Sequence, residues 1–349
     1  MTPQNWTSMK TTDFAQYVTD FLGQYLPSEC GLSQNTIKTY SLTFTLLLRY
    51  MQQVEKIKPE RLTVADITKQ RIIEFLQWTE KNRGCCVSTR NARLGALHSF
   101  FKYLQYRDVK GLFIWQEILS VKYKKYQKPE MAFLSTEAIT LVLQQPDLHS
   151  RMGLRDFVLL GLLYDSAARV QELIDMTPSN LRFGDTTTIT IRGKGSKVRT
   201  VPLSEKQVKN LRIYLERNNL LDKQRLTLPI FPNPQGNRMS RMAVLNIVKK
   251  YVGMARKTNP TLIPDDIGCH SFRHSKAVHM LEADIHLVHI RDFLGHSSVD
   301  TTEIYARASD KKKQEALVKL NPDIIVEGKT SWQKDKNLME FLKDLQHKY

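Results

Sequence analysis

The sequence predicts a mainly helical protein of two domains, with a small antiparallel sheet in the second. The chain has 349 residues, which suggests two domains at roughly 100–200 residues each. Apolar residues recur at helical spacing through residues 11–108. Two short stretches of alternating residues, 186–191 and 197–202, then predict strands. We therefore expect an all-helical first domain and an α+β second domain.

The charge balance points to a polyanionic partner. The chain carries 52 Lys and Arg against 35 Asp and Glu, a net charge of +17. A domain this basic usually binds nucleic acid, although a basic soluble enzyme is the alternative. The hydrophobic content of 41% is typical of a globular protein with a sizeable core.

Targeting and redox signals are absent from the sequence. No apolar run reaches the ~18 residues of a membrane span, and no signal peptide begins the chain. Cys30, Cys85, Cys86 and Cys269 lack the spacing of a disulfide framework or a zinc site. They are interpreted as reduced thiols. We expect a cytoplasmic, DNA-associated protein without a membrane partner.

After an N-terminal extension of residues 1–10, residues 11–120 predict a helical domain. Ser33 begins the second of its helices, Asp66 is a candidate cap for the third, and Ser88 begins the fourth. Two helix starts are polar and basic, which suits phosphate contact because helix N-termini and cations both favour anions. Their candidate DNA contacts are Thr36, Lys38, Arg90, Asn91 and Arg93. An ordinary four-helix bundle with solvated caps remains the alternative.

A basic linker, residues 121–133, precedes the predicted catalytic domain, residues 134–325. Four lysines before Pro129 predict an extended segment, and its candidate DNA contacts are Lys122, Lys124 and Lys125. In the second domain, Lys194 stands at the glycine-flanked tip between the two predicted strands. The further candidate DNA contacts in this domain are Lys197, Ser240 and Arg241. No phosphate-binding P-loop pattern is present.

A histidine and a tyrosine near the C-terminus are brought together by a predicted helix break. Gly295 is suited to end one helix, and Ser298 or Asp300 to cap the next. His296 then lies in the turn and Tyr305 on the following helix, so both can face one cleft. A phenol with a pKa near ~10 needs help to act as a nucleophile. The alternative is a turn followed by a half-buried tyrosine.

Other residues complete a site for attack on a phosphodiester. Arg169 and Arg273 are suited to clamp phosphate oxygens, and Lys194 to protonate a leaving oxygen. His270 shares a helix face with Arg273 and, like His296, can hydrogen-bond around the same phosphate. The sequence has no carboxylate cluster for a divalent metal, and its paired histidines lack a third ligand. We therefore expect a phosphotyrosine intermediate and no metal, cofactor or ATP.

Four motifs resemble those of the tyrosine recombinases, the phage integrase family. They are the segment from Ser166 to Leu173, the Gly-Lys194-Gly turn, the His270-Ser-Phe-Arg273-His segment, and the block from Leu294 to Tyr305. Each is weak alone, but their order and approximate spacing match the family. The resemblance covers about residues 11–320. It implies an N-terminal helical, SAM-like core-binding domain and an α+β catalytic domain that together clamp duplex DNA.

The resemblance implies roles for the nucleophile and its phosphate. Tyr305 resembles the nucleophile that forms a 3′-phosphotyrosyl bond and frees a 5′-hydroxyl. Arg169 and Arg273 resemble the phosphate clamp. Lys194 resembles the general acid for the 5′ oxygen.

The resemblance also implies supporting roles and shows one departure. His270 resembles the acid–base partner of the tyrosine, and His296 a further contact to the phosphate or the tyrosine. Glu172 resembles an acidic residue that buttresses the site. Ala167 stands where the family usually has glycine. A separate arm-site-binding module is expected to be absent.

The resemblance implies assembly on double-stranded DNA carrying specific recombination sites. Four protomers of a homo-oligomer, with or without sister recombinases, synapse two sites and exchange strands through a Holliday junction. The tail, residues 326–349, carries a short apolar stripe that folds back in cis or docks on a neighbouring subunit. The stripe is formed by Leu338, Phe341, Leu342 and Leu345.

The sequence leaves several alternatives for the biological role. The extra tail favours integration, excision or transposition of a mobile element over Xer-like dimer resolution. A type IB topoisomerase-like enzyme is a less favoured alternative, because a compact helical domain precedes the catalytic one. A non-catalytic DNA-binding accessory protein would be expected to have lost part of the constellation.

Overall fold

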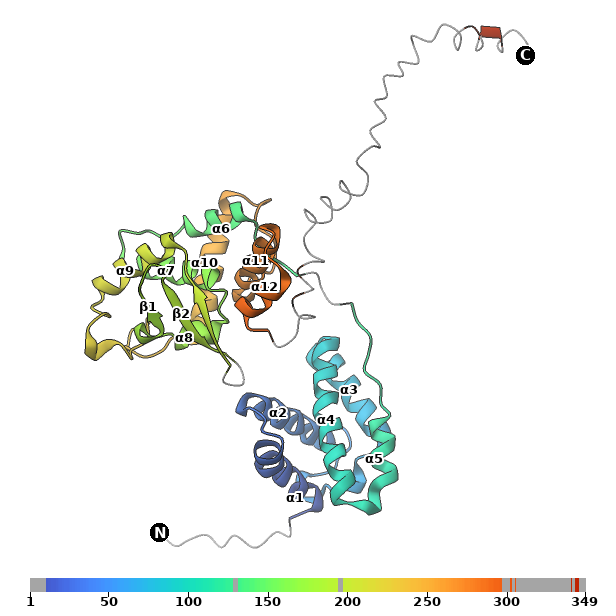
Figure 1. The fold of residues 1–349 in the computed structure, drawn as a ribbon. Helices are drawn as coiled ribbons and strands as arrows, with labels where there is room; N and C mark the ends of the chain where they lie inside the picture. The colour runs from blue at the N-terminus through green and yellow to red at the C-terminus, as the bar shows by residue number, and fades with distance from the viewer. Residues whose placement is uncertain are drawn as a thin grey trace. The chain divides into compact units, whose positions relative to one another are not determined.

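The computed structural model describes residues 11–127, 131–193 and 197–296, together with Thr302, Tyr305, Glu340, Lys343 and Asp344. This part of the chain forms two compact units that divide between residues 127 and 131 (Figure 1). The first unit is helical, and the second combines helices with a three-stranded antiparallel sheet. The predicted fold class is confirmed.

The first unit is built from five α-helices and shorter helical turns within residues 11–127. A π-helical segment, Phe21–Glu29, continues the first helix, and 3-10 turns lie at Pro59–Arg61, Val64–Asp66 and Val109–Gly111. The α-helices are α1 (Asp13–Asp20), α2 (Gln34–Gln53), α3 (Lys69–Arg83), α4 (Val87–Arg107) and α5 (Leu112–Leu119).

Aromatic rings form the centre of the first unit. Phe21 and Phe44 each meet Phe100 edge to face, with ring centroids 5.3 and 5.1 Å apart. All three side chains are almost fully buried. Such pairs add about 0.5–1.5 kcal/mol each beyond the burial of their area. This core packs the π-helical segment, α2 and α4 against one another.

The helix starts of the first unit agree with the sequence except at two places. Ser33 accepts the backbone N–H of Thr36, as a cap should. The expectation that Asp66 caps the third helix was wrong. Its carboxylate accepts the N–H and the hydroxyl of Thr63 at 2.8 and 2.7 Å, so Thr68 caps α3 instead. The fourth helix begins at Val87, one residue before the predicted start.

The second unit places a sheet beside a set of helices (Figure 1). Its strands pair in the order β1-β2-β3, with Ile191 opposite Arg199. The strands are β1 (Leu181–Arg182), β2 (Thr188–Arg192) and β3 (Val198–Pro202). The helices are α6 (Thr136–Leu143), α7 (Arg151–Asp165), α8 (Val170–Asp175), α9 (Glu205–Arg217), α10 (Arg241–Thr258), α11 (Cys269–Glu282) and α12 (Leu287–Leu294), with a 3-10 turn at Pro178–Asn180.

The packing of this unit brings distant segments to one place. The apolar helix α7 packs against α9 and α11, while α12 contacts both α11 and β3. A small apolar cluster around Ala167, Ile290 and Leu294 includes the ring of Tyr305. The turn before α8, the middle of α11 and the end of α12 therefore surround this tyrosine.

Candidate active site

Arg169 stands just before α8, in a tight turn at the end of α7. Ala167 in this turn has φ +47°, the left-handed region that glycine adopts most easily. Ala167, which stands where the resemblance leads one to expect glycine, therefore adopts this turn with some backbone strain. Its carbonyl oxygen accepts a hydrogen bond from Nη1 of Arg273 at 2.8 Å, so the turn also anchors the second arginine.

Glu172 holds two arginines at once. Its carboxylate accepts from the backbone N–H and Nη1 of Arg169 at 2.9 and 2.8 Å, and from Nη2 of Arg199 at 2.7 Å. Burial alone would raise the pKa of this carboxyl, but the hydrogen bonds from Arg199 and Arg169, together with the charge of Arg199, outweigh burial and lower it. Glu172 is therefore an ionised anchor for both arginines.

Arg273 is a buried guanidinium that is fixed by backbone oxygens. It is 2% exposed and donates to the carbonyls of Ala167 and Leu294, the latter at 2.6 Å. Burial, together with the charges of Arg169 and Arg199, lowers its pKa to about 10, so it stays protonated at neutral pH. Two fixed anchors hold the fork in one orientation, as a phosphate clamp requires.

Tyr305 is in contact with two histidines, His274 and His296. Its ring is 1% exposed, and its hydroxyl is 3.1 Å from Nδ1 of His274. The ring of His296 stacks on it, with centroids 6.2 Å apart and planes 13° from parallel. Burial raises the pKa of Tyr305, while the charge and hydrogen bonding of Arg273 and the charge of Arg169 act in the opposite direction.

The turn after α12 fixes His296. Gly295 ends the helix at φ +67°, as predicted, and leaves His296 in the turn. Nδ1 of His296 is 3.0 Å from the hydroxyl oxygen of Thr302. Burial, followed by the charges of Arg273 and Arg169, lowers the pKa of His296 to about 4. The ring is therefore neutral at neutral pH.

His270 occupies the solvent side of the same cluster. It is exposed, and its ring stacks on His274 with centroids 6.1 Å apart. Desolvation, then Arg273 and Arg169, lower its pKa. Burial is the largest cause that lowers the pKa of all three histidines, and the charge of Arg273 adds to it. Three arginines face a single ionised carboxylate here. Such an excess of positive charge attracts an anion.

Sequence reasoning missed Arg199 and gave His274 only a doubtful metal role. Arg199, on β3, donates through Nε to the carbonyl of Phe293 at 3.0 Å as well as to Glu172. It thus ties the end of α12 to the start of α8. The sequence did hold one signal for Arg199. Side chains alternate along β3, so Arg199 lies on the same face of the strand as the buried Val201.

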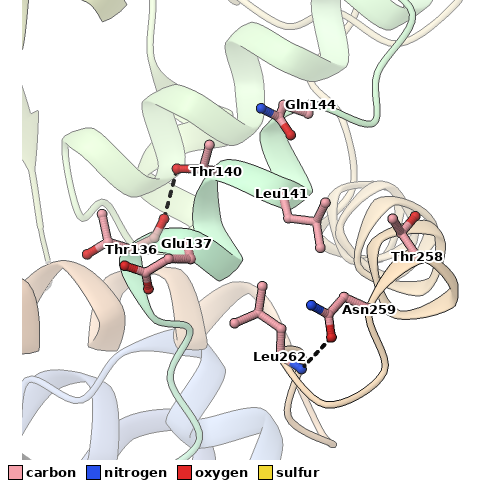
Figure 2. A pocket seen from close by; sticks show the side chains of 8 residues that line it. All are labelled: Thr136, Glu137, Thr140, Leu141, Gln144, Thr258, Asn259 and Leu262. Atoms are coloured by element: carbon pink, nitrogen blue, oxygen red, sulfur yellow. Dashed lines mark hydrogen bonds between the residues drawn. The ribbon is translucent and has the colours of Figure 1, made fainter.

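Two of the hollows in the described part of the second unit differ in their relation to the site. One of about 750 Å³ is lined by residues that include His270, His274, Arg241, Asp265 and Asp266. It borders the histidines of the site. The other, of about 500 Å³, lies between α6 and the end of α10 (Figure 2). It is lined by Thr136, Glu137, Thr140, Leu141, Gln144, Thr258, Asn259 and Leu262, apart from the predicted site residues.

In the first unit, several predicted DNA contacts hold the linker. Arg90 is 5% exposed and donates to the carbonyl of Lys122 at 3.2 Å. The side chain of Asn91 donates to the carbonyl of Lys124 at 2.8 Å and accepts its N–H at 3.1 Å. The ammonium of Lys124 pairs with Glu80 at 2.7 Å. These residues position the linker along α4.

The other predicted contacts are placed more openly. Lys38, Lys122, Lys125, Lys197, Ser240 and Arg241 are exposed, while Thr36 and Arg93 are half-buried. Arg93 donates to the sulfur of Cys85, and Arg241 to the side chain of Gln171. Lys194 lies outside the described residues, as does the apolar stripe of the tail. These DNA contacts therefore remain predictions.

Two further searches cover the described residues. Within residues 11–127, 131–193 and 197–296 and the isolated described positions, no three His, Cys, Asp or Glu side chains could hold a metal ion. No helix in this part of the chain combines the length and apolar character needed to cross a bilayer.

Comparisons with known proteins match both units. The Phage integrase family matches residues 132–312, and the Phage integrase, N-terminal SAM-like domain matches residues 18–108. The chain is 30% identical over 337 residues to the putative integrase/recombinase y4rC of Sinorhizobium fredii, covering 96% of this chain and 99% of that protein. It is 30% identical over 302 residues to tyrosine recombinase XerD of Staphylococcus epidermidis, covering 85% and 96%. The chain belongs to the phage integrase family, which confirms the expectation of a tyrosine recombinase.

Solved structures share the fold. XerH recombinase, in a post-cleavage complex with a palindromic difH substrate, has a TM-score of 0.65 at 21% identity and covers 81% of this chain and 79% of its own. The Tn1549 transposon integrase, in complex with transposon right end DNA, has a TM-score of 0.65 at 14% identity, with 87% and 99% covered. At these identities the likeness concerns the fold.

Proposed function

We propose that this protein is a site-specific DNA recombinase that cleaves and rejoins double-stranded DNA through Tyr305. One observation carries the proposal. A buried tyrosine hydroxyl lies 3.1 Å from Nδ1 of a neutral histidine; burial raises the pKa of this tyrosine, and the charges of Arg273 and Arg169 act against that rise. A structural tyrosine in an apolar core needs neither partner. The relatives named integrase and tyrosine recombinase support the same chemistry.

The chemical step is a transesterification. The oxygen of Tyr305 attacks the scissile phosphorus and forms a 3′-phosphotyrosyl bond, while the bond to the 5′ oxygen breaks. Arg169 and Arg273 neutralise the charge that develops on the phosphate, and Lys194 protonates the leaving oxygen. Loss of one such preorganised donor typically lowers the rate about 10²–10³-fold. The new ester conserves the energy of the broken bond, so rejoining needs no ATP.

We further propose that four protomers synapse two recombination sites and exchange strands through a Holliday junction. Integration, excision or transposition of a mobile element is the role we favour. The likeness to y4rC over nearly the whole chain supports it. Resolution of chromosome or plasmid dimers is the second candidate, since relatives named XerD and XerC match at similar identity.

A nicked suicide substrate carrying the element's own end sequence tests the proposal. Cleavage beside the nick releases a short fragment and traps the covalent complex, which a denaturing gel resolves. We expect an adduct with the wild-type protein in EDTA and none with Tyr305→Phe, which should still bind DNA. An adduct with both proteins would place the nucleophile elsewhere. Tight binding without an adduct from the wild type would favour an accessory role.

A further inference from the structure

We infer that His274 holds the hydroxyl of Tyr305 and takes its proton during DNA cleavage. This role deepens the proposed function and rests on it. Nδ1 of His274 is 3.1 Å from the tyrosine oxygen, and the two rings lie 5.7 Å apart at 50°. With its own proton on Nε2, the imidazole accepts the tyrosine O–H at Nδ1.

The order of the side chains along α11 favours His274 over His270. The two histidines are one helical turn apart and share a face. His274 is half-buried between the exposed ring of His270 and the buried ring of Tyr305. His270 is thereby left on the solvent side, where it is suited to contact the phosphate.

A proton acceptor is needed at this position. Burial raises the pKa of Tyr305, so the phenol is neutral before it reacts. As its oxygen bonds to phosphorus, its proton moves to Nδ1 of His274 and leaves an imidazolium. The bond between phosphorus and the 5′ oxygen breaks, and Lys194 supplies the proton for that oxygen. Rejoining reverses both transfers, so protons and charge balance over the cycle.

The charges around His274 link its basicity to the substrate. Burial, then His270 and Arg273, lower its pKa to about 4 in the free protein. Among the described residues, the site's other charged or titratable groups are Arg169, Arg199, Glu172 and His296, and across the neighbouring cavity Arg241, Asp265, Asp266 and Cys269. A bound phosphodiester adds a negative charge to this mostly positive set, which raises the pKa of His274. The histidine therefore becomes an effective base when DNA is in place.

The first arm of the test measures cleavage of the suicide substrate by His274 variants. His274→Ala should cut about 10²–10⁴-fold more slowly, the usual contribution of general base catalysis, and bind DNA as the wild type does. His274→Asn keeps an acceptor near the tyrosine but cannot take its proton, so it too should be slow. His289→Ala, an exposed histidine on α12, is the control and should cleave normally.

The second arm separates the two ends of the reaction. A substrate with sulfur in place of the bridging 5′ oxygen has a leaving group that needs no proton. We expect this substrate to restore cleavage by Lys194→Ala but not by His274→Ala. Restored cleavage by His274→Ala would overturn the inference, since the histidine would then serve the leaving group.

The third arm needs no DNA. In the free full-length protein labelled with ¹⁵N-histidine, the Nδ1 resonance of His274 should shift when Tyr305→Phe removes its donor. An unchanged resonance, or normal cleavage by His274→Ala, would contradict the inference and leave the proposed function standing. If the wild-type protein forms no adduct, the proposed function fails, and the catalytic role of His274 fails with it.

Discussion

Replacing Glu172 by glutamine should destabilise the catalytic unit more than any ordinary surface change. The side chain is 5% exposed and accepts three hydrogen bonds from two arginines. Glutamine has nearly the same shape, but it loses the charge and presents an NH₂ group to one of the guanidinium donors. The arginines are then left with an uncompensated positive charge in a buried place.

The size of the effect follows from these contacts. Removing one partner of a buried ion pair costs about 3–5 kcal/mol. Water solvates part of Arg169, whose side chain is 33% exposed, whereas Arg199 is 10% exposed. We therefore expect a loss of roughly 2–4 kcal/mol, which lowers the melting temperature of a unit this size by about 4–16 °C.

Differential scanning calorimetry is the appropriate assay. The tryptophans that the structure describes, Trp78 and Trp115, both lie in the first unit, so their fluorescence would follow the wrong transition. Glu216→Gln, at an exposed position on α9, is the control and should change the free energy of unfolding by less than about 0.5 kcal/mol. A melting temperature of the second unit in Glu172→Gln within about 2 °C of the wild-type value would refute the reasoning.

The same variant has a pH signature. The folded state lowers the pKa of Glu172 below the ordinary value of about 4.3. Its carboxylate therefore stabilises the fold above that ordinary value, and the contribution is lost as pH falls through the lowered pKa. The gap in stability between wild type and Glu172→Gln should narrow on acidification below about pH 4.3.

Two further substitutions test the scaffold. Gly295→Ala forces an alanine to φ +67° and places its Cβ 3.0 Å from Cδ of Arg199. The second unit should therefore lose more stability than the roughly 1–2 kcal/mol that left-handed strain alone costs. DNA cleavage should also be slower. Gly236→Ala is the control for backbone strain, because residue 236 has φ +81° and a Cβ there would meet nothing within 4 Å. Thermal unfolding would compare the two variants. An equal loss of stability in Gly295→Ala and Gly236→Ala would contradict the expected clash with Arg199. Asn91→Ala removes the hydrogen bonds of 2.8 and 3.1 Å to the linker backbone, so hydrogen exchange of residues 121–126 should accelerate. Asn35→Ala, at an exposed position on α2, is the control and should leave this exchange unchanged. Unchanged protection of the linker in Asn91→Ala would show that other contacts hold it.

Local features of this fold are visible in the sequence because their partners are close along the chain. Ser33, which was predicted to begin a helix, accepts a backbone N–H three residues on, and Ser135, Ser204 and Ser240 do the same at the starts of α6, α9 and α10. Gly295 adopts the left-handed cap that its place after an apolar helix predicts. The failure at Asp66 has a local cause too, since the preceding turn already uses its carboxylate.

Long-range features of the site needed the structure. Arg199 reaches Glu172 and the carbonyl of Phe293, which are 27 and 94 residues away, and no local pattern announces either contact. His274 is a similar case, because only the fold shows that its Nδ1 atom contacts the hydroxyl of Tyr305. The motif order carried the family assignment, but it did not show which histidine contacts the tyrosine.

Mapping the covalent bond tests the central claim most directly. The trapped wild-type adduct would be digested with nuclease and trypsin, and the nucleotide-bearing peptide sequenced by mass spectrometry. We expect the added mass on the tryptic peptide of residues 292–307, in which Tyr305 is the only tyrosine, through an ester that resists alkali. A modification on another peptide, or an alkali-labile ester on one of the serines or threonines of this peptide, would contradict the account.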